Sequence, residues 1–262
     1  MPPIYTPKGK AREYSPLALN IYMGCDHRCF YCFCPRGPWS YSKDYFTRDP
    51  KPREGFLADL KRQLIRGGID KQVLLNFIGD PYGTANMKYG VTRTVLEMLL
   101  EHHVPVAILT KGGMNCLRDL DLFLKFGTHI KVGASLTFDN PRDSKQFEPG
   151  AALPAERMAA LKELHDEGIM TWASLEPVIY PGQALNIIRE TRRYVDHYKV
   201  GKINHWPDLE KGADWGRFTD DVIRLCREHS IPFYIKESLQ KFYRSDQALD
   251  WELDPDHLNV MQ

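Results

Sequence analysis

The sequence predicts an α/β fold with a parallel sheet and helices packed outside it. Short aliphatic or β-branched runs alternate with longer amphipathic runs six or seven times along the chain, and this order is typical of consecutive βα units. The pattern does not separate a closed or partly closed (β/α) barrel from an open doubly wound sheet. A length of 262 residues fits one large domain better than two small ones.

Seven segments have the composition of strands, at residues 17–23, 73–78, 106–110, 130–137, 170–175, 198–203 and 233–235. Six segments between them have the periodicity of helices, at residues 55–66, 92–102, 117–126, 154–167, 183–195 and 215–229. In the fourth of these, Met158, Leu161 and Leu164 recur every three positions, and Gly168 provides a stop. The least regular stretches are 36–53, 139–153 and the tail after 241.

The composition favours a globular protein of a reducing compartment. The formal net charge is +1 and 43% of the residues are hydrophobic, so no global field attracts the chain to nucleic acid or to an anionic membrane. The first residues lack the apolar core of a signal peptide, and no run approaches the ~18 apolar residues of a membrane span. Four of the six cysteines lie within ten residues, unlike a secreted disulfide framework. We expect a cytoplasmic protein without membrane association.

The most informative feature is a loop with three closely spaced cysteines just after the first predicted strand. Cys25, Cys29 and Cys32 form a C-x3-C-x2-C pattern. Three thiolates on one loop can bind three irons of a cubane cluster and leave the fourth iron open for chemistry. Structural zinc is one alternative, with Cys34 or His27 as a further ligand, but the chain has no second cysteine pair. An electron-carrying cluster with Cys34 as fourth ligand is another, although Cys34 lies only two residues past Cys32.

This spacing, with the aromatic Tyr31 just before the last cysteine, resembles the signature of the radical S-adenosylmethionine (SAM) superfamily. The resemblance implies one 4Fe–4S cluster on Cys25, Cys29 and Cys32, SAM on the open iron, and a reducing partner of the flavodoxin or ferredoxin type. Reductive cleavage of SAM would give a 5′-deoxyadenosyl radical. The resemblance also implies a partial (β/α)6 barrel of the TIM type, with a core at about residues 15–205 and a short C-terminal extension at 206–262. Tyr31 is expected to pack over the cluster or the adenine.

Polar residues at the ends of the later strands are candidates for binding SAM, because loops at the carboxyl ends of parallel strands carry the chemistry in such folds. These candidates are Gly79, Asp80, Lys111, Ser135, Thr137 and Glu176. Together with the cysteine loop they resemble the spore photoproduct lyase branch over about residues 15–205, where the positions matching Asp80, Lys111 and Ser135 bind the cofactor. Taken singly, they also fit a plain turn, a solvated loop charge and alternating strand residues.

One position departs from the lyase pattern. The lyase has a hydrogen-donating cysteine two residues before the matching aspartate, and this chain has Ile78 there. Thymine-dimer repair therefore does not carry over, and we expect a relative with another substrate. Cys34 is a candidate near-cluster or hydrogen-donating thiol. Tyr82, His205 and Lys236 are candidates for substrate contact or hydrogen relay.

The loop at residues 36–48 bears on the substrate. It combines arginine and lysine with Trp39, Tyr41, Tyr45 and Phe46, and cations beside stacking surfaces suit single-stranded or flipped nucleotides. A nucleic-acid base is therefore a candidate substrate, although the same aromatics would equally pack the loop over the barrel. A peptide or small-molecule substrate, or a non-catalytic iron–sulfur protein, are the alternatives. The oligomeric state is not set by the sequence.

Overall fold

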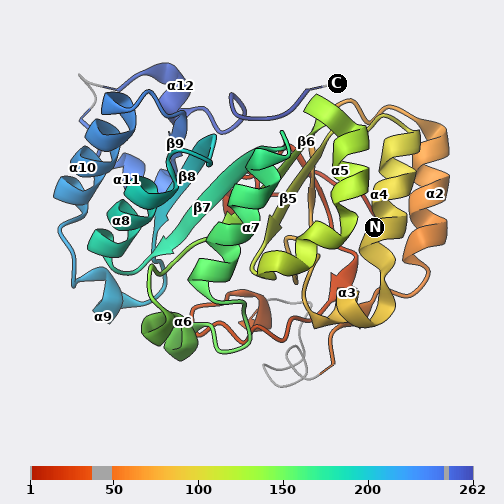
Figure 1. The fold of residues 1–262 in the computed structure, drawn as a ribbon, viewed down its shortest axis with the longest axis horizontal. Coiled ribbons are helices and arrows are strands. Elements are labelled where there is room, and N and C mark those ends of the chain that lie inside the picture. Colours follow the sequence, from red (N-terminus) through yellow and green to blue (C-terminus); the bar gives the residue numbers. More distant parts are fainter. Residues whose placement is uncertain (1, 37–48, 245–247, 262) are drawn as a thin grey trace.

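A computed structural model describes residues 2–36, 49–244 and 248–261 (Figure 1). Within them, seven parallel strands form one curved sheet in the order β1-β4-β5-β6-β7-β8-β9. Their bounds are β1 Leu17–Leu19, β4 Val73–Leu75, β5 Val106–Thr110, β6 Ile130–Ser135, β7 Met170–Val178, β8 His197–Lys202 and β9 Phe233–Ile235. Because the order follows the chain without reversal, the partial barrel is confirmed and the doubly wound alternative is excluded.

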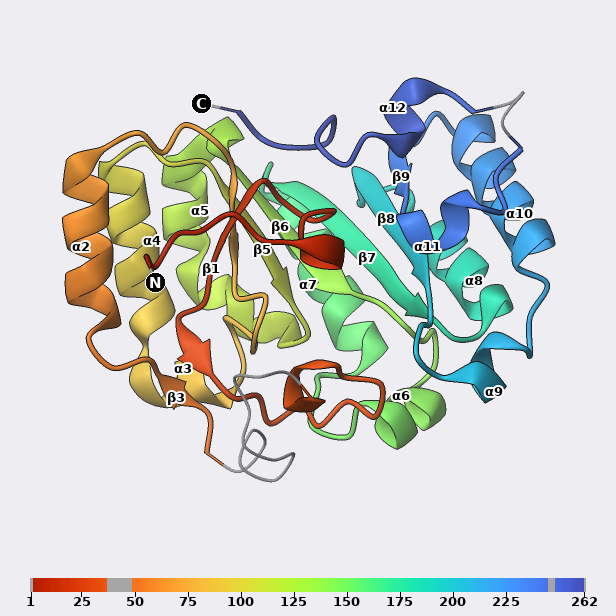
Figure 2. The ribbon, with the colours of Figure 1, turned by 180° about the vertical axis from the view of Figure 1, so that it is seen from behind.

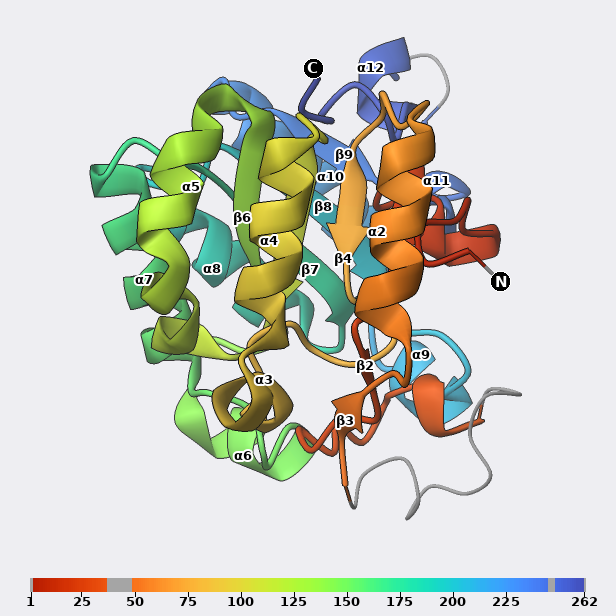
Figure 3. The ribbon, with the colours of Figure 1, turned by 90° about the vertical axis from the view of Figure 1, so that its right-hand side faces the viewer.

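Helices cover the convex face of the sheet (Figures 1 and 3). The main ones are α2 Phe56–Arg66, α4 Val91–Glu101, α5 Leu120–Phe126, α7 Pro154–Asp166, α8 Pro181–Thr191 and α10 Trp215–Glu228. They agree with the six predicted helices to within a few residues, except that residues 113–119, before α5, form a 3-10 helix. Not one of the described helices has the length and apolar character that crossing a membrane requires.

Several short helices were not predicted. They are α3 Thr84–Tyr89, α6 Pro141–Phe147, α9 Pro207–Glu210, α11 Glu237–Gln240 and α12 Asp250–Leu253. The start of α6 has a recognisable signal, because the side chain of Asn140 accepts a hydrogen bond from the Asp143 amide and Pro141 occupies the first turn. Stretch 139–153 is therefore partly helical rather than irregular.

The first predicted strand, 17–23, is divided in the structure. Residues after β1 leave the sheet, and β2 (Tyr22–Met23) pairs antiparallel with β3 (Lys51–Pro52). Side-chain amides replace backbone pairing at this point: Asn76 Oδ1 accepts from the Ile21 amide at 2.6 Å, and Asn20 Oδ1 accepts from the Ile78 amide at 2.7 Å. The exits of β1 and β4 are thus tied together by two asparagines, which directs both following loops to the same edge.

The two faces of the sheet have different chemistry. Outward-facing residues join two large apolar clusters with the helices, which supplies most of the hydrophobic stabilisation. The concave face carries the fully buried Trp172, whose indole Nε1 donates to the Ile108 carbonyl at 3.0 Å. A Cβ at Gly133 would lie 2.5 Å from that indole, so glycine on β6 makes room for the ring.

The N-terminal segment crosses the concave face, and the C-terminal tail lies at the end opposite the cysteine loop (Figure 2). Buried lysines hold both segments. Lys199 Nζ donates to the carbonyls of Glu13 (2.7 Å), Tyr14 (3.3 Å) and Pro255 (2.9 Å). Lys131 Nζ donates to the Leu258 carbonyl at 2.6 Å. Backbone oxygens far apart in sequence are therefore fixed by side chains on β6 and β8.

Replacing Lys199 by methionine tests the cost of burying this lysine, because the difference in stability between the wild type and the variant should depend on pH. Burial, together with the charge of Lys236, lowers the pKa of Lys199 from 10.5 to about 7. A buried lysine whose pKa is lowered in the folded state destabilises the protein most at pH values below that folded-state pKa. This destabilisation decreases as the pH rises from the folded-state pKa toward the unfolded-state pKa. We expect the melting temperature of the wild type to rise relative to Lys199→Met between about pH 7 and 9. A difference in melting temperature between the two proteins that does not change with pH would contradict this prediction.

Candidate functional site

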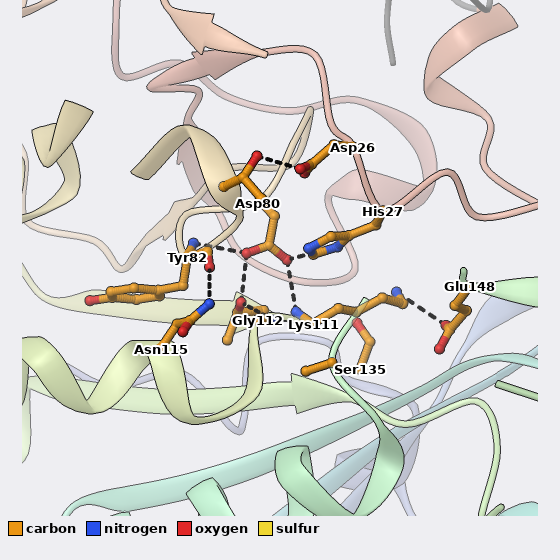
Figure 4. A network of polar contacts seen from close by, with 12 residues as sticks. Asp26, His27, Asp80, Tyr82, Lys111, Gly112, Asn115, Ser135 and Glu148 are labelled. Atoms are coloured by element: carbon orange, nitrogen blue, oxygen red, sulfur yellow. Dashed lines mark hydrogen bonds and ion pairs between the residues drawn. The ribbon is translucent and has the colours of Figure 1, made fainter. Parts of the chain in front are cut away.

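The predicted site residues gather at the carboxyl-end edge of the sheet. The cysteine loop follows β2, Asp80 follows β4, and Lys111 follows β5. Ser135 is the last residue of β6, and Glu176 lies near the end of β7. In this fold class that edge is where substrates and cofactors bind. Figure 4 shows a network of polar contacts that includes Asp80 and Lys111, with Ser135 beside them.

The cysteine loop is held down by the segment between α6 and α7. The Phe30 amide donates to the Phe147 carbonyl at 2.8 Å, and the Gly150 amide donates to the His27 carbonyl at 3.0 Å. The approach is so close that a Cβ at Gly150 would lie 2.1 Å from the Asp26 carbonyl oxygen. A stretch that the sequence marked only as irregular therefore shapes the cysteine loop.

Asp80 is the centre of a hydrogen-bond network (Figure 4). Its Oδ1 accepts from the Tyr82 amide at 2.8 Å and from the Thr110 hydroxyl at 2.6 Å. Its Oδ2 accepts from the Lys111 amide at 2.7 Å and lies 3.6 Å from Nδ1 of His27. The carboxylate thus joins the exits of β4 and β5 to the cysteine loop.

Glu148 is the principal site residue that the sequence reasoning missed. Its buried carboxylate accepts from the Tyr31 hydroxyl and from Arg157 Nη2 at 2.6 Å, and it lies 3.8 Å from Lys111 Nζ. Burial acts to raise the pKa of Glu148, but the charges of Lys111 and Arg157 outweigh it and the pKa is lowered. A glutamate in an unassigned loop gives no sequence signal for this arrangement.

The carboxyl end of β6 and the residues after it contact the same group of side chains around Glu148. Arg157 Nη1 donates to the Ser135 carbonyl at 2.8 Å, and the Thr137 hydroxyl lies 3.1 Å from that of Tyr31. Lys111 Nζ lies 5.7 Å from the centre of the Tyr31 ring, within the range of a cation–π contact. Tyr31, just before the last cysteine, therefore contacts residues from the segments that follow β5, β6 and α6.

Glu176 lies on the concave face and has a different set of partners. Its Oε2 accepts from the Tyr14 hydroxyl and from Lys236 Nζ. Its side chain is 15% exposed, whereas that of Lys236 is fully buried. The structure thus brings Lys236 to Glu176 rather than to the cysteine loop.

The two predicted catalytic residues have contrasting positions. Cys34 is buried beside the cysteine loop, and its pKa is raised well above the usual value by contact with the Cys32 thiol and by burial. Tyr82 is fully buried in the outer core, where its hydroxyl donates to Asp119 at 3.0 Å and its ring packs against Phe123. This position does not support a direct catalytic role for Tyr82.

Other substrate candidates lie at the rim. His205 is exposed after β8. The next residue, Trp206, packs against Phe30 of the cysteine loop with ring centres 4.2 Å apart. Residues 37–48, which include the predicted nucleotide-binding aromatics Trp39, Tyr41, Tyr45 and Phe46, lie outside the described residues.

The residues present fit a cubane cluster. Cys25, Cys29 and Cys32 are partly exposed on one loop, and none of them is in a disulfide. Ligand atoms of Cys25, Asp26 and His27 also lie within 4.8 Å of one another, so further groups that can bind a metal adjoin the first cysteine. Gly79 provides a second close approach, because a Cβ there would lie 2.8 Å from the Gly24 carbonyl oxygen. Thiolates are the usual ligands of such clusters.

Comparison with curated proteins gives distant relatives. An uncharacterised protein of Methanocaldococcus jannaschii is 28% identical over 231 residues, which cover 81% of this chain and 86% of that protein. An uncharacterised protein of Mycobacterium tuberculosis is 27% identical over 169 residues, covering 62% of this chain and 49% of that protein. The chain therefore spans only about half of the mycobacterial relative.

Comparison with solved structures shows the same fold. Streptococcus suis SuiB bound to S-adenosylmethionine has a TM-score of 0.63 at 15% identity, covering 89% of this chain and 53% of SuiB. A mutant of spore photoproduct lyase has a TM-score of 0.66 at 12% identity, covering 85% of this chain and 77% of the lyase. The family model of the radical SAM superfamily matches residues 19–195, which is more than half of the sequence. The chain belongs to the radical SAM superfamily.

Proposed function

We propose that this protein is a radical SAM enzyme with one 4Fe–4S cluster, bound by Cys25, Cys29 and Cys32. The observation that carries the proposal is the cysteine loop, with three cysteines outside any disulfide, at the strand edge that also presents Asp80 and Lys111. With the cluster and SAM bound, reductive cleavage of SAM would supply a 5′-deoxyadenosyl radical that abstracts hydrogen from the substrate. An electron donor of the flavodoxin or ferredoxin type in the cytoplasm would supply the electron.

The surrounding residues would bind and orient SAM. Lys111 would attract the carboxylate of SAM, since its ammonium lies at this strand edge, where it faces Glu148 at 3.8 Å (Figure 4). The backbone at Gly79 and Asp80 would receive the ammonium group. Ser135 and Thr137 would offer hydroxyls, and Glu176 would accept from a donor farther along the ligand. Tyr31 would pack over the cluster or the adenine.

A nucleic-acid base is the substrate class that we propose, with a reaction of the lyase type. The fold likeness to spore photoproduct lyase supports this class, and Ile78 argues against the same thymine-dimer repair. A peptide is the second candidate, favoured by the likeness to SuiB, which has been solved bound to the precursor peptide SuiA. Deuterium transfer from deuterated SAM into candidate oligonucleotides and peptides, followed by mass spectrometry, distinguishes the two.

The enzymatic proposal itself is tested without a known substrate. Protein reconstituted anaerobically with iron and sulfide is reduced with dithionite in the presence of SAM, and 5′-deoxyadenosine is measured by liquid chromatography. We expect its formation from the reconstituted protein. Its absence would favour the non-catalytic iron–sulfur alternative.

The cluster ligands are tested by single replacements of Cys25, Cys29 and Cys32 by alanine. Each variant should lose most of the iron and sulfide bound after reconstitution and all formation of 5′-deoxyadenosine, because two thiolates hold a cubane poorly. Cys226→Ala is a matched control, since Cys226 is a buried thiol of α10 within an apolar cluster. Normal iron content in any of the three loop variants would remove that cysteine from the ligand set.

Cys34 is proposed as a hydrogen-donating thiol rather than a ligand. Its Sγ lies 4.0 Å from the Phe77 carbonyl oxygen, close to the strand exit that carries Ile78. We expect Cys34→Ala to keep the iron content and the substrate-independent formation of 5′-deoxyadenosine. Loss of iron in this variant would instead indicate that Cys34 is a ligand. It would then favour a site with four cysteine ligands.

Glu148 is expected to be essential for stability. Glu148→Ala leaves the buried Arg157 without its only carboxylate partner among the described residues, and breaking a buried pair from one side costs about 3–5 kcal/mol. Denaturant unfolding should show a loss of this size for Glu148→Ala and a smaller loss for Glu148→Gln, which retains an acceptor. Equal stability of Glu148→Ala and the wild type would show that the ion pair contributes little.

A further inference from the structure

The segment 76–80, which follows β4, lies against the cysteine loop at both of its ends. Near its start, the Phe77 carbonyl oxygen lies 4.0 Å from Cys34 Sγ, and the Cys34 thiol contacts that of Cys32. At its far end, Asp80 Oδ2 lies 3.6 Å from Nδ1 of His27. Polar groups of this segment are therefore neighbours of the loop that would hold the cluster.

Asn76, the first residue of this segment, carries a buried hydrogen-bond donor that is not used. Its backbone has a φ of 58°, in the left-handed region that asparagine adopts more readily than most residues. The residue is only 5% exposed, and its Nδ2 has no hydrogen-bond partner among the described residues. A buried amide without an acceptor is rare because it has lost its bonds to water without replacing them.

The orientation of this amide is fixed by its oxygen. Asn76 Oδ1 accepts from the Ile21 amide at 2.6 Å, and the backbone amide of Asn76 donates to the Leu19 carbonyl at 2.9 Å. Exchanging the oxygen and the nitrogen would set the NH2 group against the Ile21 N–H, so that two donors would face each other. The unpaired atom of this side chain is therefore the nitrogen.

Nδ2 lies where the segment meets the start of the cysteine loop. A Cβ at Gly79 would lie 3.7 Å from Asn76 Nδ2 and 2.8 Å from the Gly24 carbonyl oxygen. The Tyr22 carbonyl oxygen lies 3.5 Å from the same point, and Nδ2 donates to neither carbonyl. The unused donor is thus grouped with the residue that directly precedes Cys25.

We propose that Asn76 Nδ2 donates a hydrogen bond to a sulfur of the bound cluster, at the corner held by Cys25. This inference rests on the proposed function, because the cluster is the acceptor. Hydrogen bonds to the sulfurs are one of the factors that set the reduction potential of a cluster. A donor stabilises the additional negative charge of the reduced state, so Asn76 would raise the potential without being a ligand.

The hydrogen bond is detected in full-length protein labelled with nitrogen-15 in the side-chain amide of asparagine. After reconstitution and reduction, pulsed electron paramagnetic resonance of the wild type should show a nitrogen-15 nucleus coupled to the cluster. Asn76→Asp should lose this coupling, because aspartate keeps an oxygen for the Ile21 amide but has no NH2 group. Aspartate also tolerates the left-handed backbone.

A redox titration of the same proteins gives a second measurement, and Asn76→Asp should have a lower midpoint potential than the wild type. The negative charge of an aspartate would lower the potential without any hydrogen bond to sulfur. The nitrogen-15 coupling therefore decides between the two causes. A lowered potential in Asn76→Asp, with no coupling in the wild type, would assign the effect to charge and overturn the inference.

Asn86→Asp is the matched control, because Asn86 is another buried asparagine with an unpaired Nδ2. Its Oδ1 accepts from the Tyr22 hydroxyl at 2.8 Å and from the Thr92 amide at 3.2 Å, and this variant should retain the coupling. Coupling that persists in Asn76→Asp would also overturn the inference. Failure of the proposed function is a separate result, since the wild type would then assemble no 4Fe–4S cluster or form no 5′-deoxyadenosine.

Discussion

The candidate site depends on one buried carboxylate, that of Glu148. It accepts from Tyr31 in the cysteine loop and from Arg157 on α7, and it lies beside Lys111 after β5. Arg157 in turn reaches the end of β6 through the Ser135 carbonyl. A single anion with several buried cationic and hydroxyl partners fixes their relative positions, because leaving any of these groups unpaired is costly. The cysteine loop is thereby attached to the strand edge.

The same principle is used twice more around the barrel. Asp80 joins the exits of β4 and β5 through backbone amides and the Thr110 hydroxyl, and Lys236 joins Glu13 to Glu176 across the concave face. An open half-barrel has a polar interior that cannot be filled with apolar side chains if a polar ligand is to bind there. Paired buried charges provide rigidity in such an interior without closing it.

The sequence predicted the α/β class and most of the elements, and the three cysteines stay the predicted cluster ligands. Periodicity located the main helices, and the cysteine spacing is a local pattern that needs no tertiary information. The role of Glu148 could not be predicted from the sequence, because it depends on contacts with Tyr31, Lys111 and Arg157, which are far from it in the chain or on other elements. The surroundings of Tyr82 could not be predicted for a related reason: it follows Asp80 in a polar turn, yet its ring lies in the outer core. The division of the first strand depended on the amides of Asn20 and Asn76, which the pattern of apolar residues does not show.

The central claim is that three cysteines hold a cluster whose fourth iron is open to SAM. Electron paramagnetic resonance of the reduced, reconstituted protein tests this most directly, because a ligand on the open iron perturbs the cluster signal. The account predicts that the g-values of the reduced cluster shift when SAM is added. A spectrum that is identical with and without SAM, in protein that contains its full complement of iron, would contradict it.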